Sequence, residues 1–351
     1  MGGRPSGWRR WRGNYVGGSE MAIAAWKSLL AGKTVLVTGG TGSFGKKFVE
    51  IALTVPKLKK LIIFSRDELK QYEMRRTFSD PRMRYFLGDV RDRERLYRAL
   101  AGVEIVVHAA ALKQVDAAEY NPIEVVKTNI IGTQNVLEVS LDREVERVLA
   151  LSTDKAANPV NLYGATKLCA DKLVIAANSY AGAARTKFSV VRYGNVMGSR
   201  GSVVDVFLRA RASKRVPITD PRMTRFCLSI TQCVRFVLQS LTLMQGGEIF
   251  IPKIPSIKLP DLARAVAPDC AFDIVGLRPG EKLHEVMVPE DESGNTLEYD
   301  NHYRILPVYH FWTEQEYQRD GGRAVQDRFR YSSDANTHWL TVEEIRQLLK
   351  E

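Results

Sequence analysis

Long apolar runs are missing from this sequence, and so are the marks of several specialised protein classes. The longest apolar stretches, such as residues 105–112, have the length of one strand, whereas a membrane helix needs ~18 apolar residues. No apolar segment follows the arginine-rich residues 1–20, so we expect no secretory signal. No internal repeat indicates a solenoid. We therefore expect a globular chain without a membrane span.

Cysteine is scarce, with only four residues in the chain. Cys169, Cys227, Cys233 and Cys270 are separated by 58, 6 and 37 positions, which matches no zinc-binding pattern and no CxxC redox motif. We expect a protein of the reducing cytoplasm, and we expect no metal site.

Acidic residues are too few to balance the basic ones, since 51 Lys and Arg face 40 Asp and Glu, a net charge of +11. Residues 1–20 carry four Arg and only Glu20, and the rest of the excess is spread along the chain. No arginine-aromatic motif of a nucleic-acid module is present. The excess therefore indicates an enzyme with anionic ligands, and we expect no nucleic-acid partner.

Six short β-branched or apolar segments alternate with helical patterns over the first 195 residues. These predicted strands span residues 33–37, 61–64, 84–87, 104–108, 147–152 and 188–192. Strands that alternate with helices form βαβ units and a parallel sheet. The sequence therefore predicts an α/β fold with a Rossmann-like, doubly wound parallel sheet.

The alternation changes after about residue 195, where strands become short and loops become charged. Ligands of doubly wound sheets bind at the carboxyl ends of the strands, so we expect a smaller C-terminal substrate lobe above that edge. The predicted parts are a flexible basic tail at 1–25, a dinucleotide-binding domain at 30–195 with 229–251 returning to it, and a substrate lobe at 196–228 and 252–351.

A glycine-rich turn follows the first predicted strand and opens a helix. Its glycines at 39, 42 and 45 form a G-x-x-G-x-x-G pattern, which is specific only in this strand–turn–helix context. Glycine lets the backbone approach a pyrophosphate, and the helix N-terminus attracts its charge. The predicted cofactor contacts here are Gly39, Thr41, Gly42, Ser43, Phe44 and Gly45.

The end of the second predicted strand bears on the choice between NAD and NADP. An NAD site places an acidic residue there, whereas this strand runs into Ser65, Arg66 and Asp67, with Lys70 one turn later. Arg66 and Lys70 can hold a 2′-phosphate, so we predict NADP, with Asp67 free to face the adenine. Further cofactor contacts are predicted after the third and fourth strands, at Asp89, Val90, Ala109, Ala110 and Ala111.

Tyr163 and Lys167 lie four residues apart and share one face of a predicted helix. A phenol has a pKa of about 10, and a neighbouring ammonium would lower it toward that of a useful base. The pair is weak evidence alone. Here it follows the fifth strand, whose end at Thr153 completes a Thr–Tyr–Lys triad for hydride transfer from a hydroxyl-bearing carbon.

Asp154 and Lys155 directly follow Thr153 at the same strand end. A simple dehydrogenase or epimerase needs a hydroxyl here but no carboxyl and amine beside it. An acid and a base at the reacting carbon make an elimination possible. The alternative is an ordinary ion pair of the loop.

Several segments together resemble the extended short-chain dehydrogenases/reductases, and within them the inverting UDP-N-acetylglucosamine 4,6-dehydratases. The resemblance covers about residues 30–310. It is carried by TGGTGSFGKKF at 38–48, FSRDELKQ at 64–71, AAALKQV at 109–115, EYNPIEVVKTNIIGTQNV at 119–136, LSTDKAANPVNLYGATK at 151–167, VRYGNVMGSRGSVV at 191–204, TDPRMTRF at 219–226 and RPGEKLHEVM at 278–287. Residues 331–349 are similar to the form that begins pseudaminic acid synthesis.

The resemblance implies a reaction and a role for each catalytic residue. Tyr163 takes the proton of the sugar C4 hydroxyl while hydride passes to NADP⁺, Lys167 lowers the Tyr163 pKa and holds the nicotinamide ribose, and Thr153 binds the C4 oxygen. Lys155 then removes the C5 proton and Asp154 protonates the departing C6 hydroxyl. The implied product is UDP-2-acetamido-2,6-dideoxy-β-L-arabino-hex-4-ulose.

The same resemblance implies contacts with the sugar nucleotide. The expected substrate-binding residues are Lys113, Asn195, Arg200, Arg225 and Glu281. Three positions depart from the family pattern, because Asp116 and Asp205 stand where proline is expected and Cys227 where tryptophan is expected. These departures affect loop shape and not the five catalytic positions.

Three alternatives remain at this point. A sugar-nucleotide 4-epimerase shares the fold and the Tyr–Lys pair but lacks the Asp–Lys pair. A retaining dehydratase is often bound to membranes and often lacks the tyrosine. A non-catalytic NADP-binding regulator would not need the intact triad. The family also implies a homo-oligomer, a hexamer or a dimer.

Overall fold

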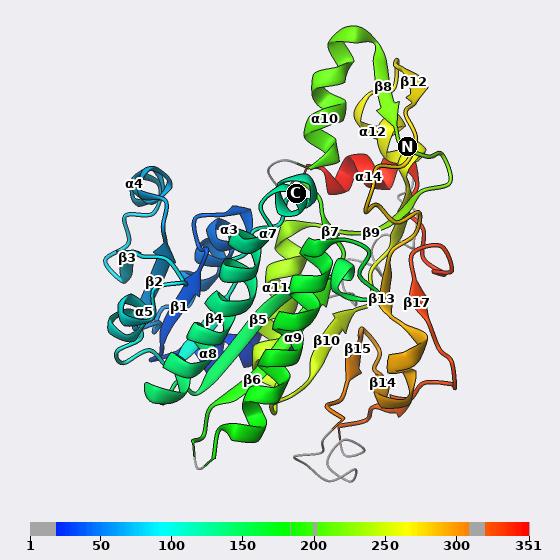
Figure 1. The fold of residues 1–351 in the computed structure, drawn as a ribbon. Helices are drawn as coiled ribbons and strands as arrows, with labels where there is room; N and C mark the ends of the chain where they lie inside the picture. The colour runs from blue at the N-terminus through cyan, green and yellow to red at the C-terminus, as the bar shows by residue number, and fades with distance from the viewer. Residues whose placement is uncertain (1–18, 183, 199–201, 309–319, 351) are drawn as a thin grey trace.

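A computed structural model describes residues 19–182, 184–198, 202–308 and 320–350. Within these residues, one large sheet has the strand order β16-β14-β15-β10-β6-β5-β4-β1-β2-β3 (Figure 1). Its strands are β1 (Thr34–Thr38), β2 (Lys60–Ser65), β3 (Met83–Leu87), β4 (Ile105–His108), β5 (Arg147–Thr153), β6 (Lys187–Tyr193), β10 (Ile249–Pro252), β14 (Thr296–Glu298), β15 (His302–Ile305) and β16 (Arg323–Ala324). The predicted doubly wound α/β fold is confirmed.

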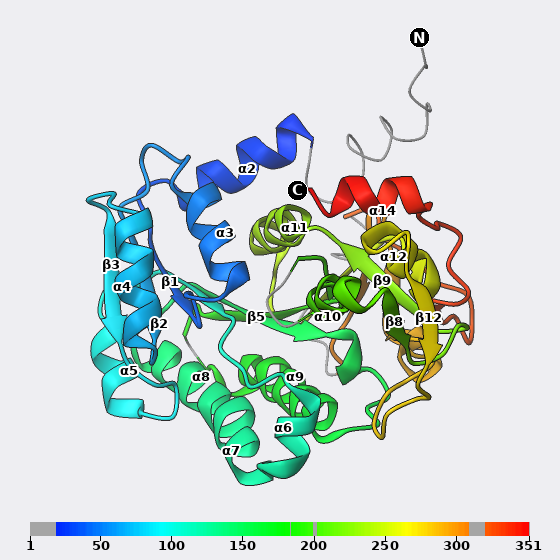
Figure 2. The ribbon, with the colours of Figure 1, turned by 90° about the horizontal axis from the view of Figure 1, so that it is seen from above.

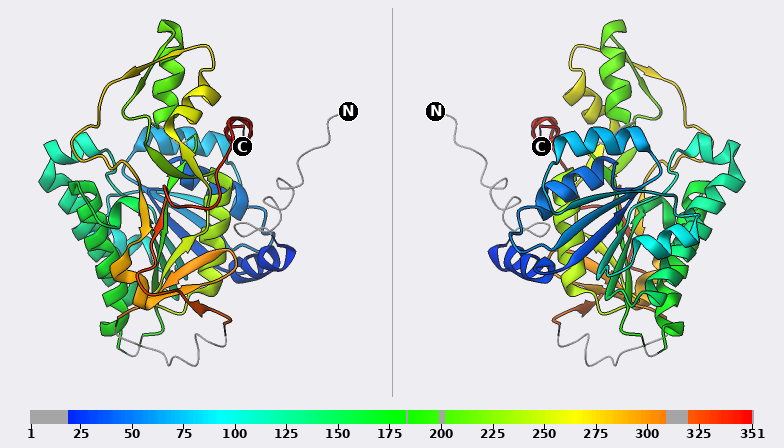
Figure 3. Two further views of the ribbon diagram at one scale, coloured as in Figure 1. Left: turned by 90° about the vertical axis from the view of Figure 1, so that its right-hand side faces the viewer. Right: turned by 90° about the vertical axis from the view of Figure 1, so that its left-hand side faces the viewer.

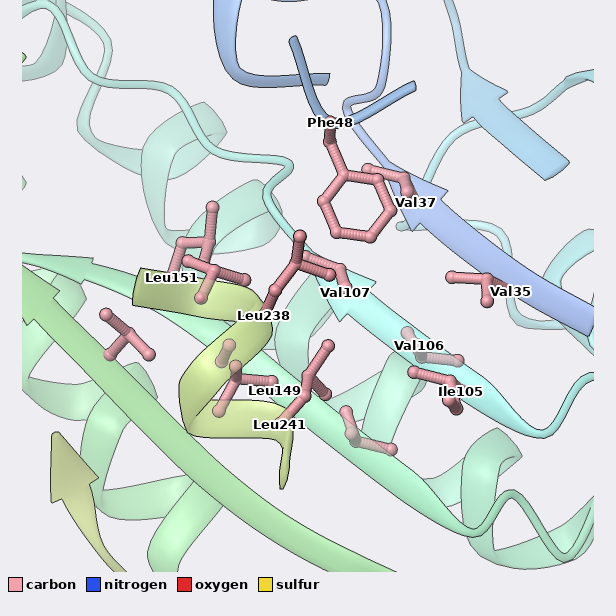
Figure 4. Close-up of a cluster of buried hydrophobic side chains, with 14 of the residues drawn as sticks. Val35, Val37, Phe48, Ile105, Val106, Val107, Leu149, Leu151, Leu238 and Leu241 are labelled. Carbon is pink, nitrogen blue, oxygen red and sulfur yellow. The ribbon is translucent and has the colours of Figure 1, made fainter. Parts of the chain in front are cut away.

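The centre of the sheet is parallel and buried on both faces. Strand β1 pairs in parallel with β2 and β4, and its five residues are all buried. Such strands carry continuous rather than alternating apolar residues, because helices cover both faces. Figure 4 shows the resulting core, in which Phe48 and Leu238 meet Val37 and Val107.

Two groups of helices cover the two faces of the sheet (Figure 2). On one face α3 and α2 pack against α11, and on the other α8 packs against α5 and α9. The helices of this part are α2 (Glu20–Leu30), α3 (Ser43–Ala52), α4 (Glu68–Thr77), α5 (Arg93–Ala99), α6 (Val115–Tyr120), α7 (Pro122–Val126), the π-helical η1 (Lys127–Ile131), α8 (Gly132–Asp142), the 3₁₀ turn η2 (Asp154–Ala156), α9 (Leu162–Tyr180), α11 (Ile230–Leu243) and the 3₁₀ helix η4 (Glu290–Asn295).

A smaller lobe rises above the carboxyl ends of the parallel strands (Figure 3) and has an apolar core of its own. Phe207, Met223 and Ile345 lie in that core. The lobe and its connections comprise β7 (Asn195–Val196), α10 (Val203–Ala210), the 3₁₀ turn η3 (Arg211–Ser213), β8 (Arg215–Ile218), β9 (Thr224–Leu228), β11 (Ser256–Lys258), α12 (Leu259–Val266), β12 (Ala271–Ile274), β13 (Val286–Val288), β17 (Tyr331–Ser332) and α14 (Val342–Leu348).

The expected C-terminal boundary between the main domain and the smaller lobe needs correction. Strands β14, β15 and β16 extend the main sheet, with β15 antiparallel to β10, so residues 296–324 do not all belong to the smaller lobe as expected. All four residues of β15 are buried, and Tyr303 and Ile305 join the main core, which short charged segments do not reveal in the sequence. Helix α11 and strand β10 do return to the main sheet, as predicted.

The N-terminal expectation also changes. Residues 1–18 of the expected flexible tail lie outside the described residues, but residues 20–25 already belong to α2. Ser19 caps this helix through its side chain, and Trp26 and Leu30 are buried. No helix among the described residues combines the length and the apolar character that crossing a bilayer requires.

Candidate active site

A cavity of about 660 Å³ opens at the carboxyl ends of the parallel strands, beneath the smaller lobe. Its lining is Gly39, Thr41, Gly42, Ser43, Phe44, Phe64, Ser65, Arg66, Asp67, Lys70, Gly88, Asp89, Val90, Ala109, Ala110, Ala111, Leu112, Lys113, Thr128, Leu151, Ser152, Thr153, Asp154, Lys155, Tyr163, Lys167, Tyr193, Gly194, Asn195, Val196 and Ile230. The structure thus brings together residues that the sequence placed after six different strands.

The glycine-rich turn lies at one end of the cavity and leaves room for a ligand. Gly39 has a positive φ of +63°, and a Cβ there would lie 2.8 Å from Cα of Ala110. Gly42 precedes the first turn of α3 and offers no side chain to cap it, so the first backbone N–H groups of the helix stay available. These features fit the pyrophosphate of a dinucleotide.

A buried hydrogen-bond network that the sequence did not reveal fixes this turn. Thr38 Oγ1 lies 2.8 Å from Nδ1 of His108 and accepts hydrogen bonds from the backbone N–H groups of Ala109 and Ala110. Nε2 of His108 lies 3.0 Å from Oγ1 of Thr133. Complete burial lowers the His108 pKa to about 3, so the imidazole is neutral. The network ties β1, β4 and α8 beneath the cofactor end of the cavity.

Gly45 does not line the cavity, and its expected contact with the cofactor stays a prediction. A Cβ at this position would lie 2.0 Å from the backbone oxygen of Gly40. The residue is therefore required for close packing of α3 against the turn.

We expect Gly45→Ala to destabilise the protein by about 1–3 kcal/mol or more, because the new methyl group meets backbone that cannot move without opening the turn. Gly294→Ala is the matched control, since no atom lies within 4 Å of a Cβ there. Thermal unfolding of both variants measures the difference. Equal midpoints for Gly45→Ala and the unsubstituted protein would contradict the packing assignment.

Two charged residues follow the end of β2: Arg66, which is partly exposed, and Asp67, whose carboxylate is hydrogen-bonded. Asp67 caps α4 through the backbone N–H of Lys70 and pairs with the Lys70 ammonium, and these hydrogen bonds lower the Asp67 pKa. The carboxylate is thus engaged in the helix cap, and Asp67 also lines the cavity, so its expected place beside the adenine stays a prediction. The Arg66 guanidinium is half exposed, with Nη1 3.5 Å from Oδ2 of Asp89.

Helix α9 carries Tyr163 and Lys167, and local contacts fix its start. Asn161 caps the helix by accepting from the backbone N–H of Gly164. A Cβ at Gly164 would lie 2.2 Å from the backbone oxygen of Lys155, so only glycine lets α9 approach η2 this closely. The glycine after Tyr163 thus brings the phenol to the Thr153–Lys155 turn.

The three consecutive residues at the end of β5 form one hydrogen-bonded unit. The Thr153 hydroxyl donates to Oδ1 of Asp154 over 2.9 Å, and Nζ of Lys155 donates to the same oxygen over 3.0 Å. Asp154 is almost fully buried, and its Oδ2 has no hydrogen-bond partner among the described residues. Lys155 Nζ also lies 3.1 Å from Oε1 of the buried Glu285.

Burial and these charges together raise the pKa values of both Asp154, the expected acid, and Lys155, the expected base. Desolvation, and secondly the Glu285 charge, raise the pKa of Asp154, although Lys155 opposes this. Burial alone would lower the pKa of Lys155, but Asp154 and Glu285 together raise it. The carboxyl is therefore prepared to accept a proton, while the amine holds one until the pair rearranges.

Tyr163 and Lys167 differ from the expected pairing. Burial raises the Tyr163 pKa to about 12, and the groups that counteract this rise are the Lys155 ammonium and a hydrogen bond with Thr153. Lys167 instead donates to the backbone oxygen of Leu151 over 2.7 Å, and burial lowers its pKa. The cation that acts on the phenol in this structure is Lys155.

The expected substrate residues fall into three groups. Lys113 and Asn195 line the cavity, and the buried Asn195 Oδ1 has no hydrogen-bond partner among the described residues. Arg225 and Glu281 do not line it; Arg225 binds backbone oxygens, including that of Thr224 over 2.7 Å. Arg200 lies outside the described residues. Arg225 therefore holds the lobe together, a role that its sequence neighbours do not indicate.

None of the three departures from the family pattern belongs to the cavity lining. Asp116 stands in the first turn of α6, and Asp205 in the first turn of α10. Cys227 is buried in β9, opposite Asn195 in the register of β7 and β9.

Sequence reasoning missed Glu285, Tyr193 and Ser152. Ser152 donates to Oδ2 of the buried Asp171 over 2.8 Å, which anchors the end of β5 to α9. Tyr193 lines the cavity beside Tyr163. Glu285 lies within the RPGEKLHEVM segment, but nothing in its spacing shows that a glutamate 130 residues from Lys155 packs against it.

The fold and this arrangement of a glycine turn, a Thr–Tyr–Lys set and an acid–base pair define an extended short-chain dehydrogenase/reductase. The sequence profile of the Polysaccharide biosynthesis protein family matches residues 35–307, so the chain belongs to that family. This assignment confirms the resemblance drawn from the motifs.

Individual relatives agree with the family. The chain is 53% identical over 326 residues to a UDP-N-acetylglucosamine 4,6-dehydratase (inverting) from Campylobacter jejuni, covering 91% of this chain and 97% of the relative. It is 38% identical to a UDP-glucose 4-epimerase from Rickettsia canadensis, covering 90% and 95%. The crystal structure of Pen from Bacillus thuringiensis superposes with a TM-score of 0.84 at 35% identity, covering 92% and 98%.

Proposed function

We propose that this protein is an inverting UDP-N-acetylglucosamine 4,6-dehydratase, a hydro-lyase. It converts UDP-N-acetylglucosamine to UDP-2-acetamido-2,6-dideoxy-β-L-arabino-hex-4-ulose, an early step toward pseudaminic acid or a related surface sugar. The observation that carries the proposal is the hydrogen-bonded Asp154–Lys155 pair beside Thr153 and Tyr163 in one cavity. The 53% identity to an inverting dehydratase supports the same reaction.

A nicotinamide dinucleotide fits the cavity between the glycine turn and α9, and we propose NADP. When bound, the cofactor accepts hydride from the sugar C4 and returns it to C6, so no external reductant is consumed. Arg66, half exposed at the cavity rim, and Lys70 supply the positive charge that a 2′-phosphate needs. The backbone of the glycine turn would hold the pyrophosphate, and Lys167 would hold the nicotinamide ribose.

In the oxidation half, Tyr163 removes the proton of the C4 hydroxyl. Its hydrogen bond with Thr153 places both hydroxyl groups at one point of the cavity, where Thr153 also binds the C4 oxygen. The Lys155 charge lowers the cost of the phenolate. Lys155 thus contributes to oxidation as well as to elimination.

In the elimination half, Asp154 must be protonated and Lys155 neutral. That state differs from the ion pair only by one proton moved along the 3.0 Å hydrogen bond between them. Lys155 then takes the C5 proton and Asp154 gives its proton to the C6 oxygen, which leaves as water. The pair returns to aspartate and ammonium, and C5 is later reprotonated from the opposite face.

The sugar nucleotide would lie over these residues beneath the smaller lobe. Lys113 supplies positive charge at the cavity, and the unpartnered Oδ1 of Asn195 can accept a hydrogen bond from the sugar. The basic side chains suit a nucleoside diphosphate.

The test is to incubate the protein and NADP⁺ with UDP-N-acetylglucosamine without added reductant, and to follow the sugar by NMR. A dehydratase yields the C6 methyl doublet and an L-configured 4-keto sugar. A 4-epimerase instead yields UDP-N-acetylgalactosamine, and a retaining dehydratase yields the D-configured ketone. A cofactor-binding regulator changes nothing.

We further propose that the protein acts in the cytoplasm as a homo-oligomer. All four cysteines are free thiols in the structure, and Cys227 and Cys233 are buried. Light scattering coupled to size exclusion distinguishes a monomer from a dimer or a hexamer.

We expect Arg66→Ala to weaken NADP⁺ binding about tenfold or more and to leave NAD⁺ binding nearly unchanged, because only NADP⁺ carries the phosphate that Arg66 would pair with. Calorimetric titration of both dinucleotides measures the difference. Arg84→Ala, on β3 outside the cavity lining, is the control. Equal losses for the two dinucleotides would contradict the proposed phosphate contact.

A further inference from the structure

Glu285 is a carboxylate from the C-terminal part of the chain that contacts the catalytic base. Its side chain is 2% exposed, and Oε1 lies 3.1 Å from Nζ of Lys155. The buried Oε2 has no hydrogen-bond partner among the described residues. A buried carboxylate destabilises the folded protein unless charges compensate it, so its place beside Lys155 needs an explanation.

The backbone of Glu285 is held firmly. Its N–H donates to Oγ of Ser333 over 2.9 Å, and its carbonyl accepts from the Ser333 N–H over 2.8 Å. The Ser333 hydroxyl lies 2.7 Å from Oγ1 of Thr224 on β9. Three segments far apart in sequence therefore fix the carboxylate that faces η2.

Charged and titratable groups surround Lys155 in this cluster. They are Asp154 on η2, Tyr163 on α9, Arg225 on β9, and Lys282 and Glu285 in the segment that leads into β13. Arg225 Nε lies 3.8 Å from Glu285 Oε1, and Lys282 Nζ lies 3.9 Å from Oε2. Their charges, with that of Lys155, keep Glu285 ionised against the effect of burial.

We propose that Glu285 is a positioning residue for the elimination, holding the Lys155 amine beside Asp154 and stabilising the ammonium that forms as the C5–H bond breaks. This inference rests on the proposed function. Asp154 and Glu285, the two carboxylates beside Lys155, have different roles in the elimination. Asp154 exchanges a proton with Lys155, whereas Glu285 stays charged and sets its place.

The charge of Glu285 also affects both members of the acid–base pair. It raises the pKa of Asp154, which favours the protonated acid, and it raises the pKa of Lys155, which favours proton capture from carbon. The proton balance is unchanged, since Glu285 neither gains nor loses a proton in the cycle. Removing the Glu285 charge should therefore slow the elimination and also shift the pH dependence of the elimination.

The experiment compares Glu285→Gln, Glu285→Asp and the unsubstituted protein with NADP⁺ and UDP-N-acetylglucosamine. We expect Glu285→Gln to lower kcat for the 4-keto-6-deoxy product about 10–100-fold while the cofactor is still reduced on mixing. The alkaline limb of the kcat profile is the fall of kcat at high pH, where the Asp154–Lys155 pair loses the proton that it shares. Without the negative charge of Glu285 this limb should move to lower pH by about one unit or more. Glu285→Asp keeps the charge and should recover part of kcat and the original limb.

Two further variants keep the test decisive. Lys282→Met removes a cation near Glu285 and Lys155, so it should move the alkaline limb to higher pH even if Glu285→Gln does not fold. Glu292→Gln is the control, because Glu292 pairs with Arg192 over a distance of 2.7 Å and not with Lys155 or Asp154. This variant should lower the melting temperature without moving the alkaline limb.

The outcomes separate this inference from the proposed function. Product from the unsubstituted protein, together with an unmoved limb in both Glu285→Gln and Lys282→Met, would show that Glu285 is only structural. No 4-keto-6-deoxy product from the unsubstituted protein would overturn the proposed function and, with it, the role of Glu285.

Discussion

Lys155→Met should abolish dehydration while leaving the first oxidation detectable. The variant removes the base for the C5 proton, and general acid–base groups are worth about 10²–10⁴-fold in rate. Tyr163, Thr153 and Lys167 stay in place, so UDP-N-acetylglucosamine should still reduce part of the bound nicotinamide cofactor. Stopped-flow absorbance of the reduced nicotinamide and NMR of the sugar measure the two steps separately.

The structure adds a second effect to this variant. The Lys155 charge lowers the Tyr163 pKa, so its loss should raise that pKa and move the oxidation rate to higher pH. The extent of cofactor reduction should be retained, although it is reached more slowly. The two buried carboxylates of Asp154 and Glu285 also lose their shared cation, which should lower the melting temperature.

Lys172→Met is the control for the exchange of lysine for methionine. Lys172 lies on α9, its side chain is 62% exposed, and it does not line the cavity, so product formation should stay normal. Near-normal dehydration by a folded, cofactor-binding Lys155→Met protein would make Asp154–Lys155 a structural ion pair. The 4-epimerase alternative would then be favoured.

Local sequence patterns predicted most of the fold and many of the residues that line the cavity. The six predicted strands appear within one or two residues of their expected ends, because buried parallel strands are continuous apolar runs between breakers. The ends of those strands meet at one edge of a parallel sheet, so the motifs that follow them had to converge. Lys113 and Asn195 line the cavity for the same reason.

Contacts between distant segments could not be read from the sequence in the same way. Arg225 and Glu281 lie in motifs that resemble those of the family, yet Arg225 binds the backbone of its own lobe. Glu285 reaches Lys155 only because β13 pairs with β17 near the C-terminus. A short strand of two or three residues has no periodicity that would have predicted this pairing.

The sequence also could not show which groups the Lys167 ammonium contacts. The four-residue spacing from Tyr163 places both side chains on one face of α9, but it does not specify where each one ends. Lys167 is drawn to the carbonyl of Leu151 at the end of β5, while the turn of η2 brings Lys155 toward the phenol. A lysine eight residues before Tyr163 therefore acts on its pKa through tertiary packing.

Tyr163→Phe should block both halves of the reaction. Hydride cannot leave C4 unless the hydroxyl proton is removed, and elimination needs the ketone that this oxidation creates. We expect a loss of about 10²–10⁴-fold or more in kcat, with no reduced cofactor on mixing with substrate. This result differs from Lys155→Met, in which reduced cofactor appears without product.

The pH dependence of the unsubstituted protein tests the same assignment. The Tyr163 pKa of about 12 means that the phenol is protonated at neutral pH before ligands bind, so the oxidation rate should rise with pH. Tyr163→Phe should show no such rise. Tyr193→Phe is the matched control, because Tyr193 also lines the cavity but is hydrogen-bonded to Cys233. Cofactor reduction by Tyr163→Phe at the normal rate would show that another group takes the C4 proton.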